Sequence, residues 1–258
     1  MTLRLRDIDT APLTHVARLG STNEEALAHA RRGDAGPLWI SADQQTQGRG
    51  RRGRSWVSPV GNLYVSLMFR TGAAPSALPQ LAHVAAVALV QAIRATASPV
   101  SRLCIKWPND VLVDKAKVAG ILVEATMAPD RTQACVIGWG VNCSYHPEGL
   151  AYLTTDLSRV SGRAISAADL LQHLRPAMAE HLALWDEGRG FGEIRALWLA
   201  DALPVDTPLT VRSDREQVEG RFQGIDGQGR LLLLGPHGPV TVEAGDVFLD
   251  ERSAASVG

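Results

Sequence analysis

The sequence contains a long stretch without a single acidic side chain. Between Gln44 and Asn109 there is no aspartate or glutamate, although the chain of 258 residues has a formal net charge of only -1. A net charge so close to zero gives no general reason to expect a polyanionic partner such as nucleic acid. The same stretch contains the basic residues Arg49, Arg51, Arg52, Arg54, Arg70, Arg94, Arg102 and Lys106. We therefore expect this part of the chain to build a local site for an anion.

Cysteine is scarce, and long apolar runs are missing. Cys104, Cys135 and Cys143 are odd in number and have no CxxC spacing, so the sequence indicates neither a zinc site nor a disulfide framework. Each lies among apolar residues, which is typical of buried free thiols. The N-terminus has no apolar core of a signal peptide, and no run approaches the roughly 20 apolar residues of a membrane span. We expect a cytoplasmic protein without membrane contact.

Apolar spacing predicts a helix, then a succession of strands, then helices again. Residues 19–36 read as a helix that begins with a capping box of Ser21 and Glu24 and ends at Gly33. The expected strands are 37–43, 62–70, 102–107, 110–114, 116–126 and 133–142, and the expected buried helix is 76–97. Helical spacing returns over 167–203, and short strands with Gly-rich turns follow it.

The order of these elements predicts the fold class. It lacks the regular strand–helix alternation of a doubly wound sheet and favours an α+β fold. We expect a mixed, largely antiparallel sheet with helices packed on one face, followed by a small β-barrel-like appendage. Residues 1–203 would form the larger domain and residues 204–258 the C-terminal one.

Residues 48–55, GRGRRGRS, can be interpreted in four ways. They contain the dinucleotide pattern GxGxxG, and they miss the phosphate-binding pattern GxxxxGK[ST] because Arg54 replaces lysine. Both patterns need a helix after the loop, whereas the following residues show strand alternation. The third interpretation is an arginine-rich arm that binds RNA, but this sequence lacks the interleaved aromatic residues and the wider basic face that such binding would use. The fourth interpretation is a solvated basic turn without a role, which only the rest of the sequence can argue against.

Two later segments are unusual in composition. KWPND, residues 106–110, reads as a turn between two strands, because a residue before proline favours extended geometry and Asn-Asp favours a turn. GWGVN, residues 138–142, places two glycines in an apolar strand, where they weaken the strand unless another group approaches the backbone closely. Taken singly, each segment has a purely structural explanation.

Taken together, these segments resemble the biotin protein ligase family. STN, QTQGRGRRGRSW, KWPNDVLVDKAKVAGILVE and GWGVN occur in that family's order and spacing from about Gly20 to Asn142. The C-terminal GIDGQGRLLLL resembles the family's small SH3-like domain. About 20 residues precede the first expected helix, which leaves no room for a helix-turn-helix domain. The resemblance is therefore to the monofunctional class, which does not bind DNA.

The resemblance implies a reaction in two steps. Biotin and MgATP give biotinyl-5′-AMP and pyrophosphate, and a lysine of a biotin carboxyl carrier protein domain then takes the biotin and releases AMP. In the first step one anion attacks another, so charge repulsion is the main obstacle. Positioned cations reduce this repulsion, and they act most strongly in a closed, dry site. The resemblance also implies a monomer or a weak homodimer that uses ATP and Mg²⁺.

The resemblance assigns roles to individual residues. It places Lys117 at the biotin carboxylate and the acyl phosphate, with Arg51, Arg52 and Arg54 at the phosphates. It assigns to biotin and ATP the residues Ser21, Thr22, Asn23, Gln45, Gly48, Arg49, Gly50, Arg51, Trp56, Lys117, Gly120, Gly138 and Asn142. Lys106, Asn109 and Asp110 would shape the site, and Asp110 is a candidate ligand for magnesium.

Some alternatives stay open at this point. Trp139 stands where the family more often has a small or aliphatic residue, and it could line the pocket or point into the core. A lipoate ligase would share the chemistry, but it would make poor use of the polar side chains Ser21, Thr22 and Gln45. A nucleic-acid-binding regulator would bind with a steep salt dependence and without ATP. An inactive biotin-binding module is the remaining alternative, although Lys117 and the arginines are intact.

Overall fold

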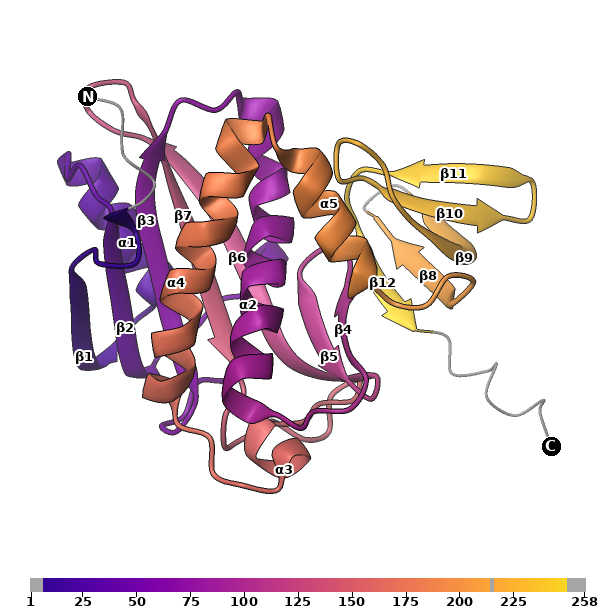
Figure 1. Ribbon diagram of the computed structural model, residues 1–258, viewed down its shortest axis with the longest axis horizontal. Helices are drawn as coiled ribbons and strands as arrows, with labels where there is room; N and C mark the ends of the chain where they lie inside the picture. The colour runs from indigo at the N-terminus through magenta and orange to yellow at the C-terminus, as the bar shows by residue number, and fades with distance from the viewer. Residues whose placement is uncertain (1–6, 214–215, 250–258) are drawn as a thin grey trace.

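Two β-sheets organise the part of the chain that the computed structural model describes, residues 7–213 and 216–249 (Figure 1). The larger one is seven-stranded, in the order β1-β2-β3-β7-β6-β5-β4. Its strands are β1 (Leu13–Leu19), β2 (Leu38–Gln45), β3 (Leu63–Thr71), β4 (Leu103–Lys106), β5 (Asp110–Val113), β6 (Ala116–Met127) and β7 (Gln133–Val141). β1 and β2 run parallel, and the other neighbouring pairs are antiparallel. This confirms the mixed, largely antiparallel sheet expected from the sequence.

Helices cover both faces of this sheet. They are α1 (Thr22–Arg32), α2 (Leu81–Ala97), α3 (Leu157–Ser161), α4 (Ala167–Trp185) and α5 (Phe191–Ala200), with short 3₁₀ segments η2 (Arg51–Gly53), η3 (Pro75–Gln80) and η4 (Asp186–Gly188). α2 and α4 lie on the face into which Trp39 and Ile137 point. Neighbouring residues along a strand point to opposite faces, so Ile40 on β2 and Val136 on β7 point to the other face, where α1 packs against them. The expectation of helices on one face therefore holds for α2 and α4 but not for α1.

The apolar helix α2 is the centre of the core. Together with η3 it forms a segment, Pro75–Ala97, of 23 residues with a mean hydropathy of 1.5, which is long and apolar enough to cross a membrane. The expectation that no segment reaches this length and apolarity is therefore wrong. In the fold, however, 72% of an 18-residue apolar stretch of this segment is buried, and α2 packs against α4, α5 and the sheet. Its composition reflects burial inside the protein.

The C-terminal strands form a separate small sheet. Strands β8 (Pro208–Arg212), β9 (Gln217–Ile225), β10 (Leu231–Gly235), β11 (Gly238–Val242) and β12 (Asp246–Leu249) are antiparallel, in the order β11-β10-β9-β8-β12. This confirms the expected β domain. The Gly229 carbonyl oxygen in its β9–β10 turn accepts hydrogen bonds from His83 Nε2 and Trp107 Nε1, each at 3.0 Å. The boundary at residues 203 and 204 stays a prediction.

Three local features differ from expectation. β1 is not visible in the sequence, because this edge strand is largely exposed and shows no alternation of apolar residues. Ser21 is the N-cap of α1, but its side chain makes no capping hydrogen bond, so the capping box is wrong. Gly33 does end the helix, in the left-handed region at φ 97. Cys104, Cys135 and Cys143 are free as expected, although Cys104 is only partly buried.

Candidate active site

Glycines on β6 and β7 form the floor of the candidate site. Gly120 pairs with Gly140, and Leu122 pairs with Gly138 further along the same two strands. A Cβ on Gly140 would lie 2.5 Å from Trp56 Nε1, and a Cβ on Gly120 would lie 3.2 Å from the same ring. The missing side chains therefore let Trp56 approach the sheet. Gly140 was absent from the predicted site, although it makes this contact.

Trp139 points away from the site. Its side chain is buried on the opposite face, where its ring stacks on Trp39 with centroids 5.7 Å apart. Its indole Nε1 donates a hydrogen bond of 3.2 Å to the carbonyl oxygen of Ala85 in α2. Of the two alternatives for Trp139, the structure therefore favours the core.

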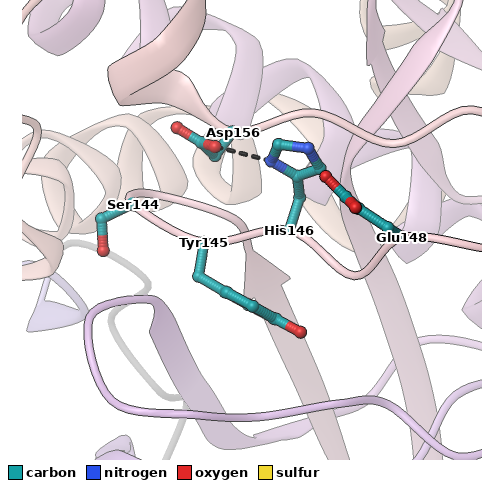
Figure 2. A pocket seen from close by; sticks show the side chains of 5 residues that line it. All are labelled: Ser144, Tyr145, His146, Glu148 and Asp156. Atoms are coloured by element: carbon teal, nitrogen blue, oxygen red, sulfur yellow. Dashed lines mark hydrogen bonds and ion pairs between the residues drawn. The ribbon is translucent and has the colours of Figure 1, made fainter.

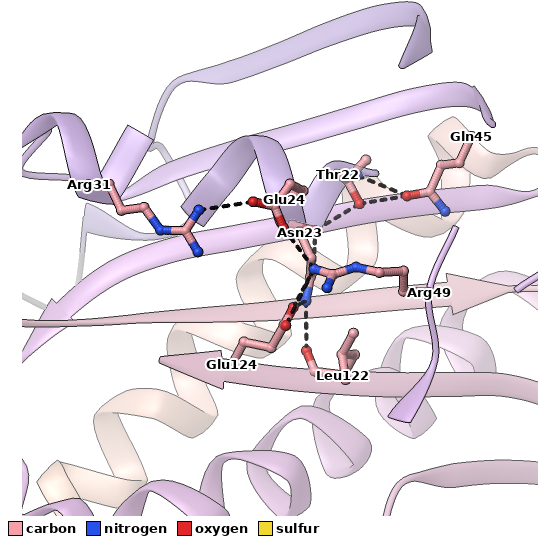
Figure 3. A network of polar contacts seen from close by, with 9 residues as sticks. Thr22, Asn23, Glu24, Arg31, Gln45, Arg49, Leu122 and Glu124 are labelled. Carbon is pink, nitrogen blue, oxygen red and sulfur yellow. Dashed lines mark hydrogen bonds and ion pairs between the residues drawn. The ribbon is translucent and has the colours of Figure 1, made fainter. Parts of the chain in front are cut away.

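The start of α1 carries hydrogen bonds between hydroxyl and amide groups (Figure 3). The backbone N–H and the hydroxyl of Thr22 both donate to Gln45 Oε1, at 2.9 and 3.2 Å. Asn23 lies over Gly138, where a Cβ would be only 2.0 Å from Asn23 Oδ1. Ser66 Oγ on β3 lies 2.6 Å from the same oxygen and 2.8 Å from the Thr22 hydroxyl. The structure thus brings Thr22, Asn23, Gln45 and Gly138 together, and it adds Ser66, which carries no motif signal.

Lys117 lies at the other end of the glycine floor. Its Nζ is 2.6 Å from Asp110 Oδ1, and Lys106 Nζ is 3.0 Å from Asp110 Oδ2. Burial acts to raise the pKa of Asp110, but the charges of Lys117 and Lys106 outweigh it and hold this pKa at about 2. The Lys117 ammonium also lies 5.2 Å from the ring centre of Trp56 and 5.5 Å from that of Tyr152. A carboxylate and two aromatic faces around the Lys117 ammonium hold it in a fixed position.

Asp110 does not fit the role of a magnesium ligand. Each of its carboxylate oxygens is already paired with a lysine ammonium. In the described part of the chain, no group of three or more His, Cys, Asp or Glu side chains could hold a metal ion. Mg²⁺ in nucleotide sites takes one or two free carboxylates together with phosphate oxygens. The geometry therefore makes Asp110 a partner of the lysines.

The arginine loop, residues 48–55, has a defined conformation in this structure. Arg49 and Ser55 form an antiparallel bridge, and the N–H of Gly50 donates to the carbonyl oxygen of Arg54 at 2.7 Å. Gly48 has no room for a side chain, because a Cβ would lie 2.5 Å from Ser58 Oγ. The loop borders a pocket of about 450 Å³ lined by Gln45, Thr46, Gln47, Gly48, Arg49, Gly53, Ser55, Trp56, Val57 and Ser58.

The four arginines of this loop point in different directions. Arg49 Nη2 lies 3.0 Å from Glu24 and 3.4 Å from Glu124, at the end of the site where α1 begins. Arg54 Nη2 lies 2.6 Å from Asp246 in the C-terminal domain, and Arg52 lies 3.6 Å from the same carboxylate. Arg49 therefore lies apart from Arg52 and Arg54, two of the three arginines that the resemblance places at the phosphates.

Arg51 is the loop arginine that reaches the KWPND turn. Its Nη1 donates to Asn109 Oδ1 at 3.4 Å and to the carbonyl oxygen of Gly245 at 3.3 Å. Burial lowers the pKa of its guanidinium, although the charges of Asp246 and Asp110 oppose the change. Lys106 is anchored in the same way, because its Nζ donates to the carbonyl oxygen of Val247 at 2.8 Å. The C-terminal domain thus helps to hold the cations, which the sequence did not indicate.

Asn142 is buried and uses its amide within the fold. Its Nδ2 donates to the carbonyl oxygen of Thr155 at 3.0 Å, and its backbone N–H donates to that of Val118. The backbone of residues 153–155 is in turn hydrogen-bonded to the backbone of Lys117. The Lys117 N–H donates to the carbonyl oxygen of Leu153 at 2.8 Å, and the Thr155 N–H donates to the carbonyl oxygen of Lys117 at 3.0 Å. The assignment of Asn142 to biotin and ATP stays a prediction. What the structure supports is that Asn142 holds the strand segment beside Lys117.

A second pocket opens in the connection after β7 (Figure 2). This pocket has a volume of about 330 Å³ and is lined by Ser144, Tyr145, His146, Glu148 and Asp156. His146 Nδ1 lies 2.6 Å from Asp156, which ties the two ends of this connection together. No motif in the sequence pointed to this segment, whose contact with Lys117 depends on the three-dimensional fold.

Comparisons with known proteins agree on one family. The model of the Biotin/lipoate A/B protein ligase family matches residues 17–142, and the model of the Biotin protein ligase C terminal domain matches residues 208–250. A biotin–[acetyl-CoA-carboxylase] ligase of Paracoccus denitrificans is 41% identical over 90% of this chain and 98% of its own length. A bifunctional ligase/repressor of Bacillus subtilis is 34% identical over 90% of this chain and 72% of its own length.

A solved structure shows the same arrangement of both domains. The biotin protein ligase of Aquifex aeolicus in complex with biotin and ATP superposes with a TM-score of 0.79 and 25% identity, covering 93% of this chain and 98% of that one. On these findings the chain belongs to the biotin protein ligase family.

Proposed function

We propose that this protein is an ATP-dependent biotin ligase that forms biotinyl-5′-AMP and transfers biotin to a lysine of a biotin carboxyl carrier domain. The observation that carries this proposal is the position of Lys117, held by Asp110 near the partly buried Arg51 on a floor of glycines. The relative from Paracoccus denitrificans is a biotin–[acetyl-CoA-carboxylase] ligase, which supports the same substrate for this chain. The cytoplasm and a monomeric or weakly dimeric state are parts of the same proposal.

Biotin would bind at the neutral end of the site. Its ureido ring presents two N–H donors and one carbonyl acceptor, so it needs neutral partners of both kinds. Thr22, Asn23 and Gln45 supply hydroxyl and amide groups there, and all of them lie on regular elements or at their ends. Ser21, which is buried beside them, belongs to the same end. A lipoyl ring has no use for these polar groups, which favours biotin over lipoate.

Activation would take place at the charged end. A carboxylate oxygen of biotin forms a bond to the α-phosphorus of ATP, and the bond from that phosphorus to the bridging oxygen breaks to release pyrophosphate. Lys117, fixed by Asp110, would neutralise the carboxylate and phosphate oxygens as they approach. Arg51, Arg52 and Arg54 would receive the phosphates, and Trp56 would lie on the adenine side. Magnesium enters this scheme only with ATP as the substrate MgATP.

Transfer needs little more than positioning. The carrier lysine, as the neutral amine, forms a bond from nitrogen to the biotinyl carbonyl carbon, and AMP leaves with the electrons of the broken acyl–oxygen bond. The amine proton is released to solvent. Lys117 would stabilise the negative charge on the departing phosphate, so one cation serves both steps.

The experiment is a transfer assay. The purified chain is incubated with biotin, ATP and a biotin carboxyl carrier domain, and the carrier is probed with streptavidin. Labelling that requires both biotin and ATP is the expected result, together with biotin-dependent exchange between ATP and pyrophosphate. A carrier that stays unlabelled, with no such exchange, would overturn the proposal. Lipoate in place of biotin tests the alternative substrate.

A further inference from the structure

Glu124 on β6 lies at the neutral end of the site, where the proposed reaction makes no use of it. Its Oε2 accepts a hydrogen bond of 2.9 Å from Asn23 Nδ2. Arg49 Nη2 lies 3.4 Å from each of its two oxygens. One carboxylate thus touches a residue that would bind biotin and the first arginine of the loop above it (Figure 3).

The strand register explains why this contact forms here. Side chains alternate along a strand, so Leu122 and Glu124 point to the same face of the sheet. Gly138 pairs with Leu122 and leaves the space that Asn23 fills. Glu124 is the next residue along that face, directly beside the Asn23 amide. The Glu124 side chain is 26% exposed, against 51% for Glu24, the other carboxylate on Arg49.

We propose that Glu124 is a positioning residue that connects biotin binding to closure of the arginine loop. Its carboxylate sets the Asn23 amide with Nδ2 toward Glu124 and Oδ1 toward Ser66. It also attracts the Arg49 guanidinium and so holds the start of the loop over the biotin end. Without the Glu124 carboxylate, Asn23 Nδ2 would keep only its hydrogen bond of 3.3 Å to the carbonyl oxygen of Leu122. Arg49 would keep only its ion pair with the exposed Glu24.

Charge explains why a carboxylate is needed at this position. Arg52 and Arg54 are drawn to Asp246 on the C-terminal domain, and Arg49 is drawn the opposite way. The loop is therefore held at two ends by acids from two domains. A pair as exposed as Arg49 and Glu24 holds poorly by itself, because solvent screens it. The better-shielded Glu124 is the contact that keeps Arg49 at the biotin end.

Because this role rests on the proposed function, the test begins with the unaltered chain in biotin-dependent ATP–pyrophosphate exchange. No exchange there would refute the function. Given exchange, Glu124→Gln keeps an acceptor for Asn23 but removes the charge, and Glu124→Ala removes both. Losing a charged hydrogen-bond partner predicts a KM for biotin raised roughly tenfold in Glu124→Gln and further in Glu124→Ala. The KM for ATP and the kcat should change by less than about threefold.

The matched control is Glu24→Gln, which removes the other carboxylate from Arg49 without touching Asn23. It should leave the KM for biotin within about threefold of the original, as expected for an exposed pair. In an Arg49→Gln background, Glu124→Gln should add less than it does alone, because the two residues act together.

A second readout does not depend on turnover. Biotin should protect the loop arginines of the unaltered chain from trypsin, and this protection should be lost in Glu124→Ala at the same biotin concentration. Thermal unfolding reports whether each variant is folded. Folded Glu124 variants with an unchanged KM for biotin, or with KM values for biotin and ATP raised alike, would overturn the role of Glu124 and leave the proposed function intact.

Discussion

The two ends of the candidate site are built on different principles. The neutral end consists of hydroxyl and amide groups from α1, β2 and β3, all within the first domain, joined by hydrogen bonds of 2.6 to 3.2 Å. The charged end consists of lysines and arginines whose anchors come partly from the second domain, through Gly245, Asp246 and Val247. A rigid neutral end suits recognition of an uncharged ring, whereas cations shared by two domains suit a ligand that arrives and leaves with its phosphates.

The largest effect is expected from Lys117 at the charged end. Lys117→Ala should lower the rate of adenylate formation by about 10²-fold or more, which is the usual loss when a stabilising donor is removed. The KM for biotin should change far less, since the neutral end stays in place. Pre-steady-state formation of biotinyl-5′-AMP is the measurement. A rate close to that of the unaltered chain would refute the role of Lys117.

The glycine floor offers a sharper comparison within one strand. Gly138→Ala places a Cβ against Asn23, and Gly140→Ala places one against Trp56, two residues further along β7. We expect Gly138→Ala to raise the KM for biotin and Gly140→Ala to raise the KM for ATP, each by roughly tenfold, which is about 1.4 kcal/mol. Gly192→Ala on α5 is the control, because nothing lies within 4 Å of its Cβ position. Equal effects of both variants on both substrates would show that the two ends are not separate.

A smaller effect is expected where the loop meets the second domain. Asp246→Asn removes the carboxylate that attracts Arg54 and Arg52. Without ligand, trypsin should then cut the loop about threefold faster, in line with the modest strength of exposed pairs. With biotinyl-5′-AMP bound, both proteins should be equally protected, because the ligand orders the loop. A loop that is cut equally fast with and without ligand in the unaltered chain would contradict this prediction.

Much of the fold, but only part of the site, could be predicted from the sequence. The apolar alternation of β3 and the all-round apolar pattern of α2 depend on local sequence, and both elements are present, although α2 begins at Leu81 after a 3₁₀ segment instead of at residue 76. β1 was missed because an exposed edge strand needs no apolar face. Ser66, Gly140 and Asp246 were missed because their contacts come from chain segments far away in sequence. Motif spacing identified residues that lie near one another in the fold, but it did not show that Arg49 points away from Arg52 and Arg54.

His83 on α2 contacts Gly229 in the β9–β10 turn of the C-terminal domain, and this contact is part of the junction between the domains. We expect the stability of the protein to fall in acid because of His83, whereas catalysis at neutral pH should not depend on this residue. Burial lowers the pKa of His83 from its usual 6.5 to about 4, and the hydrogen bond to Gly229 offsets this only in part. The folded protein therefore keeps His83 neutral between about pH 4 and 6.5, where the unfolded chain binds a proton. Stability is complete above pH 6.5 and falls as the pH drops toward 4, by at most about 3 kcal/mol from this group.

His83→Gln keeps a donor for Gly229 but cannot take up a proton. The variant should lose a large part of the decline in unfolding free energy between pH 6.5 and 4, measured by urea denaturation. Asp110 does not interfere, because its lowered pKa of about 2 contributes stability that is lost only below this window, as the pH falls from about 4 through 2. The exchange rate at neutral pH should stay within about twofold, since His83 lies on α2, behind the sheet face that carries the glycine floor. An unchanged acid dependence in His83→Gln would mean that other groups set the acid stability of the junction.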